Sequence, residues 1–219
     1  MKRSRLLIPL VLIPAVVLVG SRLSGGRRHL IVSLAVAILS LWLFALGYER
    51  RQTGSRRMVL ASVMIALSVV GRLIPVFKPV TAITVLAAVY LGGETGFLVG
   101  AMSALLSNFL FGQGPWTPFQ MLAWGLIGLL AAASARRLRG GRLAISLFGV
   151  ASGVVFSLVM DVWTVLWMEA DPGLSHYTAA LVAALPHTLL YAVSNFLFLW
   201  FLSKPFGKKL ERIRIKYGL

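Results

Sequence analysis

The chain has 219 residues, of which 58% are hydrophobic and 13% charged, and its mean hydropathy is +0.87. These values exclude an ordinary soluble globular domain and predict an integral membrane protein. The net charge of +16 does not indicate nucleic-acid binding, because the basic residues stand at the ends of apolar segments and not on one soluble face.

Residues 1–50 are predicted to form an N-terminal hydrophobic extension with one or two membrane helices. The stretch KRSRLLIPLVLIPAVVLVG has the basic start and short apolar run of a signal peptide. It lacks a convincing small-residue cleavage site, so we expect it to stay uncleaved. A second apolar segment follows at about 30–47. Simple alternation then places Arg22, Arg27 and Arg28 outside, against the positive-inside rule.

An all-α membrane domain is predicted over residues 57–203, followed by a basic tail at 204–219. A helix needs about 20 apolar residues to cross the hydrocarbon layer. Six segments approach this length, although the second is short. They lie at 58–76, 80–92, 96–111, 117–136, 143–166 and 178–203.

Three basic clusters predict the orientation of these spans. They precede the first span, follow the fourth and follow the sixth, so they share one side if the spans alternate. That side is expected to be the cytoplasm of a cell-membrane protein. The loops around Lys78, Gln113 and Asp171 then face outward. The clusters consist of Arg50, Arg51, Arg56 and Arg57; Arg136, Arg137, Arg139 and Arg142; and Lys204, Lys208, Lys209, Arg212, Arg214 and Lys216.

Small residues at four-residue spacing predict close helix packing. Contacts within the bundle are the ordinary explanation, and docking onto a partner membrane protein is the alternative. The stripes are Gly96, Gly100 and Ala104; Gly149, Gly153 and Ser157; and Ser62 with Ala66.

The sequence offers little for catalysis. The three histidines and six acids form no HExxH or similar ligand spacing, and GxxxxGK[ST] does not occur. The absence of cysteine excludes thiolate metal sites and a cysteine nucleophile. We therefore predict no catalytic residue, metal or cofactor. One alternative is a metal site where Asp161, His176 and Asp171 meet near the outer surface, and another is a polytopic membrane enzyme that uses Asp161 and His176.

Polar and aromatic residues near the outward end are candidates for ligand binding. Arg72 either extends to the interface or contacts a ligand anion. Asp161 is the only acid within an apolar run; it serves a ligand or a structural ion pair, with Arg72 as a partner. Tryptophans here belong to an aromatic belt or stack on a flat solute. The predicted ligand-binding residues are Arg72, Lys78, Thr81, Asn108, Gln113, Trp116, Thr117, Gln120, Asp161, Trp163 and Trp167.

Three segments carry a family resemblance. SNFLFGQGPWTPFQMLAWGLIGLLA at 107–131 resembles a characteristic stretch of the substrate-specific (S) components of energy-coupling factor (ECF) vitamin transporters. RLIPVFKPVTAITVLAAVYLGGETGFLVGAMSALLSN at 72–108 and FLSKPFGKKLERIRIKYGL at 201–219 are similar to the same family, in matching order. The resemblance covers about 57–219.

The resemblance implies a six-helix S-component bundle, here preceded by one or two extra helices. Such a subunit captures a micronutrient from outside and docks onto a transmembrane T component that carries two ATPases. A small-residue motif on the first core helix docks there, and Ser62 and Ala66 keep its spacing, with serine replacing one alanine. The branch implied is that of cobalamin or its precursors, with queuosine precursors as another substrate. A carrier that works without the ATPases is a further alternative.

Overall fold

The computed structural model describes residues 6–22, 28–48, 54–168 and 173–217. Every regular element in these ranges is a helix, which confirms the predicted all-α fold. Four helices contain spans long and apolar enough to cross a membrane, at His29–Leu46, Gly93–Phe111, Arg142–Trp167 and Leu174–Tyr217. The elements are η1 (Ile8–Leu12), α2 (Ile13–Arg22), α3 (Arg28–Tyr48), α4 (Gly54–Gly71), α5 (Val80–Leu91), α6 (Gly93–Phe111), α7 (Thr117–Ala133), α8 (Ala135–Leu138), α9 (Arg142–Met168) and α10 (Leu174–Tyr217).

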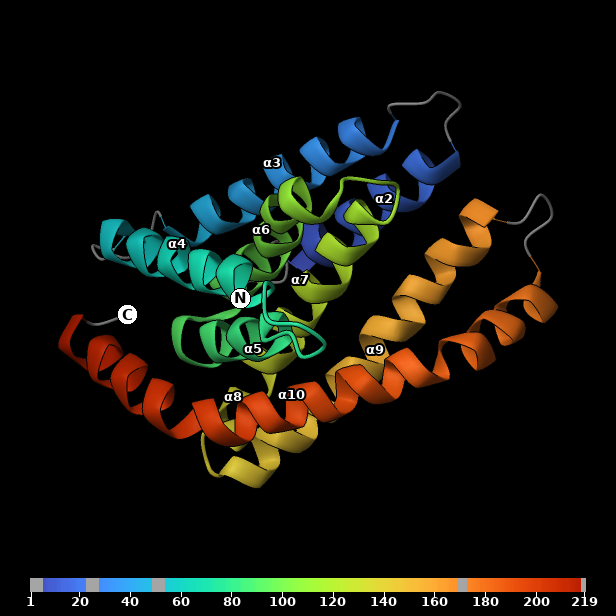
Figure 1. The fold of residues 1–219 in the computed structure, drawn as a ribbon. Coiled ribbons are helices and arrows are strands. Elements are labelled where there is room, and N and C mark those ends of the chain that lie inside the picture. Colours follow the sequence, from blue (N-terminus) through green and yellow to red (C-terminus); the bar gives the residue numbers. More distant parts are fainter. Residues whose placement is uncertain (1–5, 23–27, 49–53, 169–172, 218–219) are drawn as a thin grey trace.

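The helices form a bundle around α5, α6 and α7 (Figure 1). The long helices α9 and α10 pack on each other along one side, and α10 also contacts α5. The extension helices α2 and α3 pair with each other and lie against α6 and α7. The extension therefore covers a face of the bundle instead of standing apart from it.

Helix α5 explains why the second predicted span is short. All its residues except Tyr90 are buried. Neighbouring helices surround an interior helix and shield it from lipid, so it does not need the length of a span that faces lipid.

Helix α4 ends earlier than the predicted span 58–76. It stops at Gly71, and the chain then runs through a loop to Pro79. Pro75 cannot donate a backbone hydrogen bond, and Val76 has φ of 65°, a conformation that a β-branched residue rarely adopts. Arg72 and Lys78 consequently lie on a loop beside the bundle.

Helix α10 continues beyond the predicted end at residue 203. It contains Pro186 and Pro205 and reaches Tyr217, so the described part of the basic tail is helical. Its 44 residues correspond to about 66 Å at 1.5 Å per residue, roughly twice the hydrocarbon thickness.

The glycine stripes pack helices inside the bundle. A Cβ on Gly100 would come within 2.6 Å of the Trp124 backbone, and one on Gly96 within 2.4 Å of Ala88 Cβ. On α9, a Cβ on Gly153 would approach the backbone of Ala192 at 2.9 Å. These glycines allow α6 to approach α5 and α7, and α9 to approach α10.

Candidate ligand-binding site

Arg72 is buried beside the last turn of α6, with 9% of its surface exposed. Its Nη1 donates hydrogen bonds to Ser107 Oγ and, at 2.7 Å, to Asn108 Oδ1. The guanidinium carbon lies 5.1 Å from the ring centroid of Phe111 and 5.7 Å from that of Trp124. Polar and aromatic partners thus hold the Arg72 side chain against α6 and α7.

Asn108 connects α6 to the start of α7. While its Oδ1 accepts from Arg72, its Nδ2 donates to Thr117 Oγ1 at 2.8 Å and to Gln120 Oε1 at 2.9 Å. Asn108 and Thr117 are buried, and Gln120 is half-buried. Asn108 therefore links three other residues predicted for the site by direct hydrogen bonds.

Gln113 closes the turn between α6 and α7. Its Nε2 donates to the Leu105 carbonyl at 2.9 Å, and its Oε1 accepts from Thr117 Oγ1 at 3.0 Å. Both ends of the amide are thus occupied by the protein, so Gln113 fixes the shape of this turn.

Trp116 folds back over the same turn and meets α9. A Cβ on Gly114 would lie 2.3 Å from the Trp116 ring, so a side chain at 114 would displace that ring. Gly112 has φ of +102°, which favours glycine. The Trp116 and Trp163 ring centroids are 5.9 Å apart in an edge-to-face arrangement. The turn formers of the motif therefore place an aromatic pair at this end of the bundle.

Trp124 belongs to the core and not to an interfacial belt. It is 5% exposed, and its Nε1 donates to Thr81 Oγ1 at 3.1 Å. Its ring stacks on Phe156 with centroids 4.6 Å apart, and Phe156 in turn contacts Tyr191 at 5.1 Å. Thr81 and Trp124 thus form a hydrogen-bonded pair in the core, and the Trp124 ring lies next to the Arg72 guanidinium.

Lys78 lies on the loop that follows Val76. Its backbone N–H donates to Ser194 Oγ on α10 at 3.1 Å, and its Nζ lies 5.8 Å from the Phe111 ring centroid. Burial lowers the pKa of Lys78, and the nearby positive charge of Arg72 lowers it further. Two cations therefore share one aromatic neighbour at this end of the molecule.

Three buried polar atoms of predicted site residues have no hydrogen-bond partner in the described part of the chain: Arg72 Nε, Asp161 Oδ2 and Trp163 Nε1. Asp161 is 5% exposed, yet no ion pair joins it to Arg72 among these residues. A buried polar atom without a partner typically costs about 1–3 kcal/mol, so each of these atoms would be stabilised by a ligand group that reached it.

The structure describes only some of the acidic and histidine residues considered for an enzyme or metal site. Asp171 lies outside the described residues, and His176 is exposed at the start of α10. Within the ranges described, no three His, Asp or Glu side chains group as a metal site.

Trp167 lies where the extension meets the bundle. Together with Pro115 and Phe119 it borders a narrow space against Gly20 and His29, near the ends of α2 and α3. The extension therefore touches the turn that carries Trp116, a contact that the sequence did not predict.

The two predicted docking residues lie on an open face of α4. Ser62 and Ala66 are exposed and border an apolar groove of about 530 Å³. Leu41 and Phe44 of α3 also line this groove. The extension thus flanks the small-residue face without covering it.

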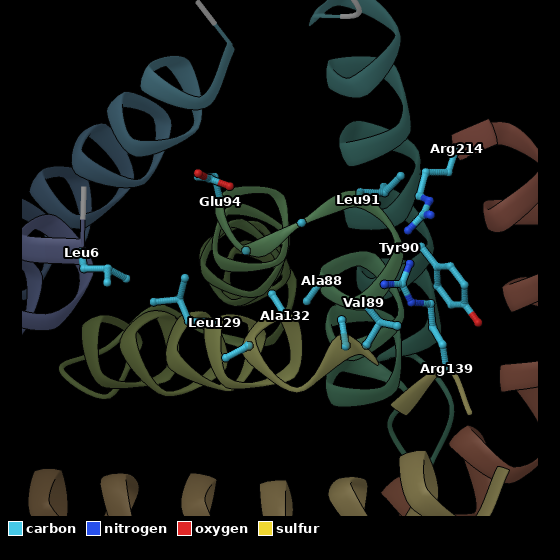
Figure 2. A pocket seen from close by; sticks show the side chains of 14 residues that line it. Leu6, Ala88, Val89, Tyr90, Leu91, Glu94, Leu129, Ala132, Arg139 and Arg214 are labelled. Carbon is cyan, nitrogen blue, oxygen red and sulfur yellow. The ribbon is translucent and has the colours of Figure 1, made fainter. Parts of the chain in front are cut away.

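The basic end of the bundle contains a separate cavity of about 540 Å³. Figure 2 shows Tyr90, Arg139 and Arg214 gathered at one side of it and Glu94 at another. Glu94 pairs with Arg57 at 3.4 Å, which ties α6 to α4. The predicted ligand residues do not line this cavity, so it is not part of the site described above.

Several contacts of the site come from residues not singled out in the sequence. These residues supply a hydrogen-bond acceptor for Arg72, aromatic contacts, and a hydrogen-bond partner for the loop that carries Lys78. Ser107 is adjacent to Asn108 and Phe111 lies in the same sequence segment, so their closeness in sequence to predicted residues could have indicated a role in the site. The other three residues come from distant helices, and no local pattern indicates them. These residues are Ser107, Phe111, Phe156, Tyr191 and Ser194.

Residues 53–212 match the family model described as ECF-type riboflavin transporter, S component. The match covers most of the chain and includes α4 to α9 and nearly all of α10. It describes a family of transporter subunits and not of enzymes. No curated protein and no solved structure matches.

Proposed function

Because the chain belongs to the family of ECF-type riboflavin transporter S components, we propose that it captures a micronutrient at the end of the bundle where α6 meets α7. A T component and two ATPases then drive delivery across the membrane. Ser62 and Ala66 on α4 provide the docking face for the T component, since small residues allow close helix approach.

One observation supports this position above all. Arg72 Nε, Asp161 Oδ2 and Trp163 Nε1 are buried without partners in the part of the chain that is described, and the Arg72 and Trp163 side chains lie beside the rings of Trp124 and Trp116. Two of these atoms are donors and one is an acceptor, so they match a solute that carries both kinds of group.

The proposed ligand is a flat, heteroatom-rich micronutrient. Aromatic faces suit a planar ring system, while a few polar groups fix its orientation. Riboflavin is the first substrate to test, because the family description names it. Cobalamin or a precursor is the second, on the resemblance of the GQGPWTP motif, and a queuosine precursor is the third.

An uptake experiment tests the proposal. Cells that express this chain together with a T component and both ATPases should accumulate one of the labelled solutes. Cells with an ATPase inactivated in its phosphate loop should not accumulate it, although they should still bind it at the membrane. Equal uptake in both strains would favour a carrier that works without the ATPases, and uptake of none of the solutes would contradict the proposal.

A further inference from the structure

A small cavity of about 270 Å³ lies at the basic end, between the end of α5, the turn from α8 to α9, and α10. It is distinct from the ligand-binding site and from the docking face on α4. We propose that this cavity binds a phosphate group, presented by the headgroup of an anionic lipid. Arg139, Arg142, Lys204 and Lys208 line it, and no acidic residue does so within the described ranges.

The charges of this phosphate cavity are largely uncompensated. Arg139 has Glu211 at 3.9 Å, but Glu211 also pairs with Arg214 at 3.3 Å. In the described residues no ion pair is formed by Arg142, Lys204 or Lys208. A concave site lined by one sign of charge attracts a counter-ion.

The backbone adds to this attraction. Helix α9 begins at Arg142 immediately after Gly140 and Gly141, and all three residues line the cavity. Its first turn starts with the bond from Ile145 N–H to the Gly141 carbonyl at 3.3 Å. The N–H groups at a helix N-terminus have no partners within the helix and favour an anion. No atom lies within 4 Å of the Cβ position at Gly141, so a ligand oxygen can approach this backbone.

Two buried donors point independently to a ligand. Ser203 lines the cavity and is 8% exposed, and its Oγ has no partner in the described structure. Arg142 is half-buried, and its Nε is a buried atom without a hydrogen-bond partner in the described structure, although the guanidinium carbon also lies 5.6 Å from the Trp200 ring centroid. Buried polar groups are nearly always hydrogen-bonded, and a phosphate carries acceptor oxygens for both donors.

The surroundings favour a lipid as the source of the phosphate. The helices that line the cavity expose large apolar side chains within two turns of it: Leu143 at 58%, Leu147 at 53% and Phe201 at 65%. Acyl chains can lie on such side chains while the headgroup meets the cations, as is usual where basic residues border the membrane. Free inorganic phosphate would share the polar contacts but not the apolar ones.

The test uses the purified full-length protein in detergent, titrated with dioctanoyl phosphatidylglycerol, dioctanoyl phosphatidylcholine or inorganic phosphate while the thermal midpoint is followed. Phosphatidylglycerol should stabilise the protein at lower concentration than phosphatidylcholine. Arg142→Gln with Lys208→Gln should weaken this effect by about tenfold. The matched control, Arg136→Gln with Arg137→Gln, removes the same charge from exposed positions outside the cavity and should change it less than about twofold.

Ser203→Ala keeps the proposal testable if the double variant does not fold. It should keep or raise the thermal midpoint without lipid, because an unpartnered hydroxyl is removed, and weaken the phosphatidylglycerol effect by about fivefold. Inorganic phosphate with the same affinity as phosphatidylglycerol would confirm the phosphate site and overturn the lipid as its source. An equal loss of the phosphatidylglycerol effect in both double variants would overturn the site. So would the absence of any response to both phosphatidylglycerol and inorganic phosphate.

Discussion

Asp161 is a residue whose surroundings would favour contact with a ligand. It is a buried carboxylate on α9, and its Oδ2 has no partner within the described residues. A charge in this position destabilises the empty protein and stabilises a complex in which a donor reaches it. Opposite effects on stability and binding are therefore expected from its removal.

Asp161→Asn tests this directly. We expect the thermal midpoint of the ligand-free protein to stay equal or rise, and the affinity for the bound micronutrient to fall by about 1–3 kcal/mol. Thermal unfolding and equilibrium titration measure the two effects. Glu211→Gln at the basic end is the control and should leave the affinity unchanged. A variant that binds as tightly as the parent would remove Asp161 from the site.

Lys78 is the residue from which we expect a pH dependence of ligand binding. Its lowered pKa means that the folded protein releases this proton below the value of about 10.4 for a free lysine. At a pH between the lowered pKa of Lys78 and the free-lysine value, the unfolded chain binds more protons than the folded protein. The contribution of Lys78 to the free energy of unfolding therefore rises with pH over this range. Ligand binding through the Lys78 ammonium group has the opposite pH dependence, because the contact with a ligand acceptor is lost when Lys78 releases its proton.

We therefore expect the dissociation constant to increase as pH rises through the lowered pKa of Lys78. Lys78→Arg should remove the increase, because arginine stays protonated. Titrations between about pH 7 and 10 provide the measurement. An identical pH profile in parent and variant would show that Lys78 does not contact the ligand.

At the level of the helices, the long apolar segments of the sequence located most of them well, because turn residues separate these segments. The misplaced boundaries have identifiable causes. The loop after α4 depends on Pro75 and on the unusual conformation of Val76, and α10 passes through Pro205 where sequence patterns predict a stop.

The sequence selected several polar residues that the structure brings together, but it did not predict which of them pair with each other. Arg72, Asn108, Thr117 and Gln120 were selected as polar residues in apolar surroundings, and they do lie together. Their pairing depends on how α6 and α7 meet, which no local pattern encodes. Likewise, the sequence could not distinguish Trp124, which stacks in the core, from Trp116, which lies at the end of the bundle.

Helix α4 carries the proposed docking face, and Ala66→Leu tests it. A larger side chain there should prevent close approach of a partner helix. We expect co-purification with the T component and ATPases to be lost while micronutrient binding is retained. Ala179→Leu is the matched control, since Ala179 is also exposed but lies on α10. Retained assembly in the Ala66 variant would place the docking face elsewhere.

At the scale of the whole molecule, the proposed orientation places the basic clusters in the cytoplasm and the turn between α6 and α7 outside. The chain has no cysteine, so single cysteines report accessibility without background. A membrane-impermeant maleimide should label Ser175→Cys in intact cells and Arg136→Cys only after permeabilisation. The reverse pattern would invert the orientation.

We propose that this protein binds a micronutrient beside Trp116 and Trp163. Titration of purified protein, followed by tryptophan fluorescence, tests it most directly with riboflavin, cobalamin and a queuosine precursor. We predict saturable binding of at least one, with a dissociation constant on the order of nanomolar to low micromolar. Trp116→Ala should weaken it by about 1–3 kcal/mol, while Trp42→Ala, which alters an exposed side chain on α3, should not. Folded protein that binds none of the three, or equal weakening in both variants, would contradict the claim.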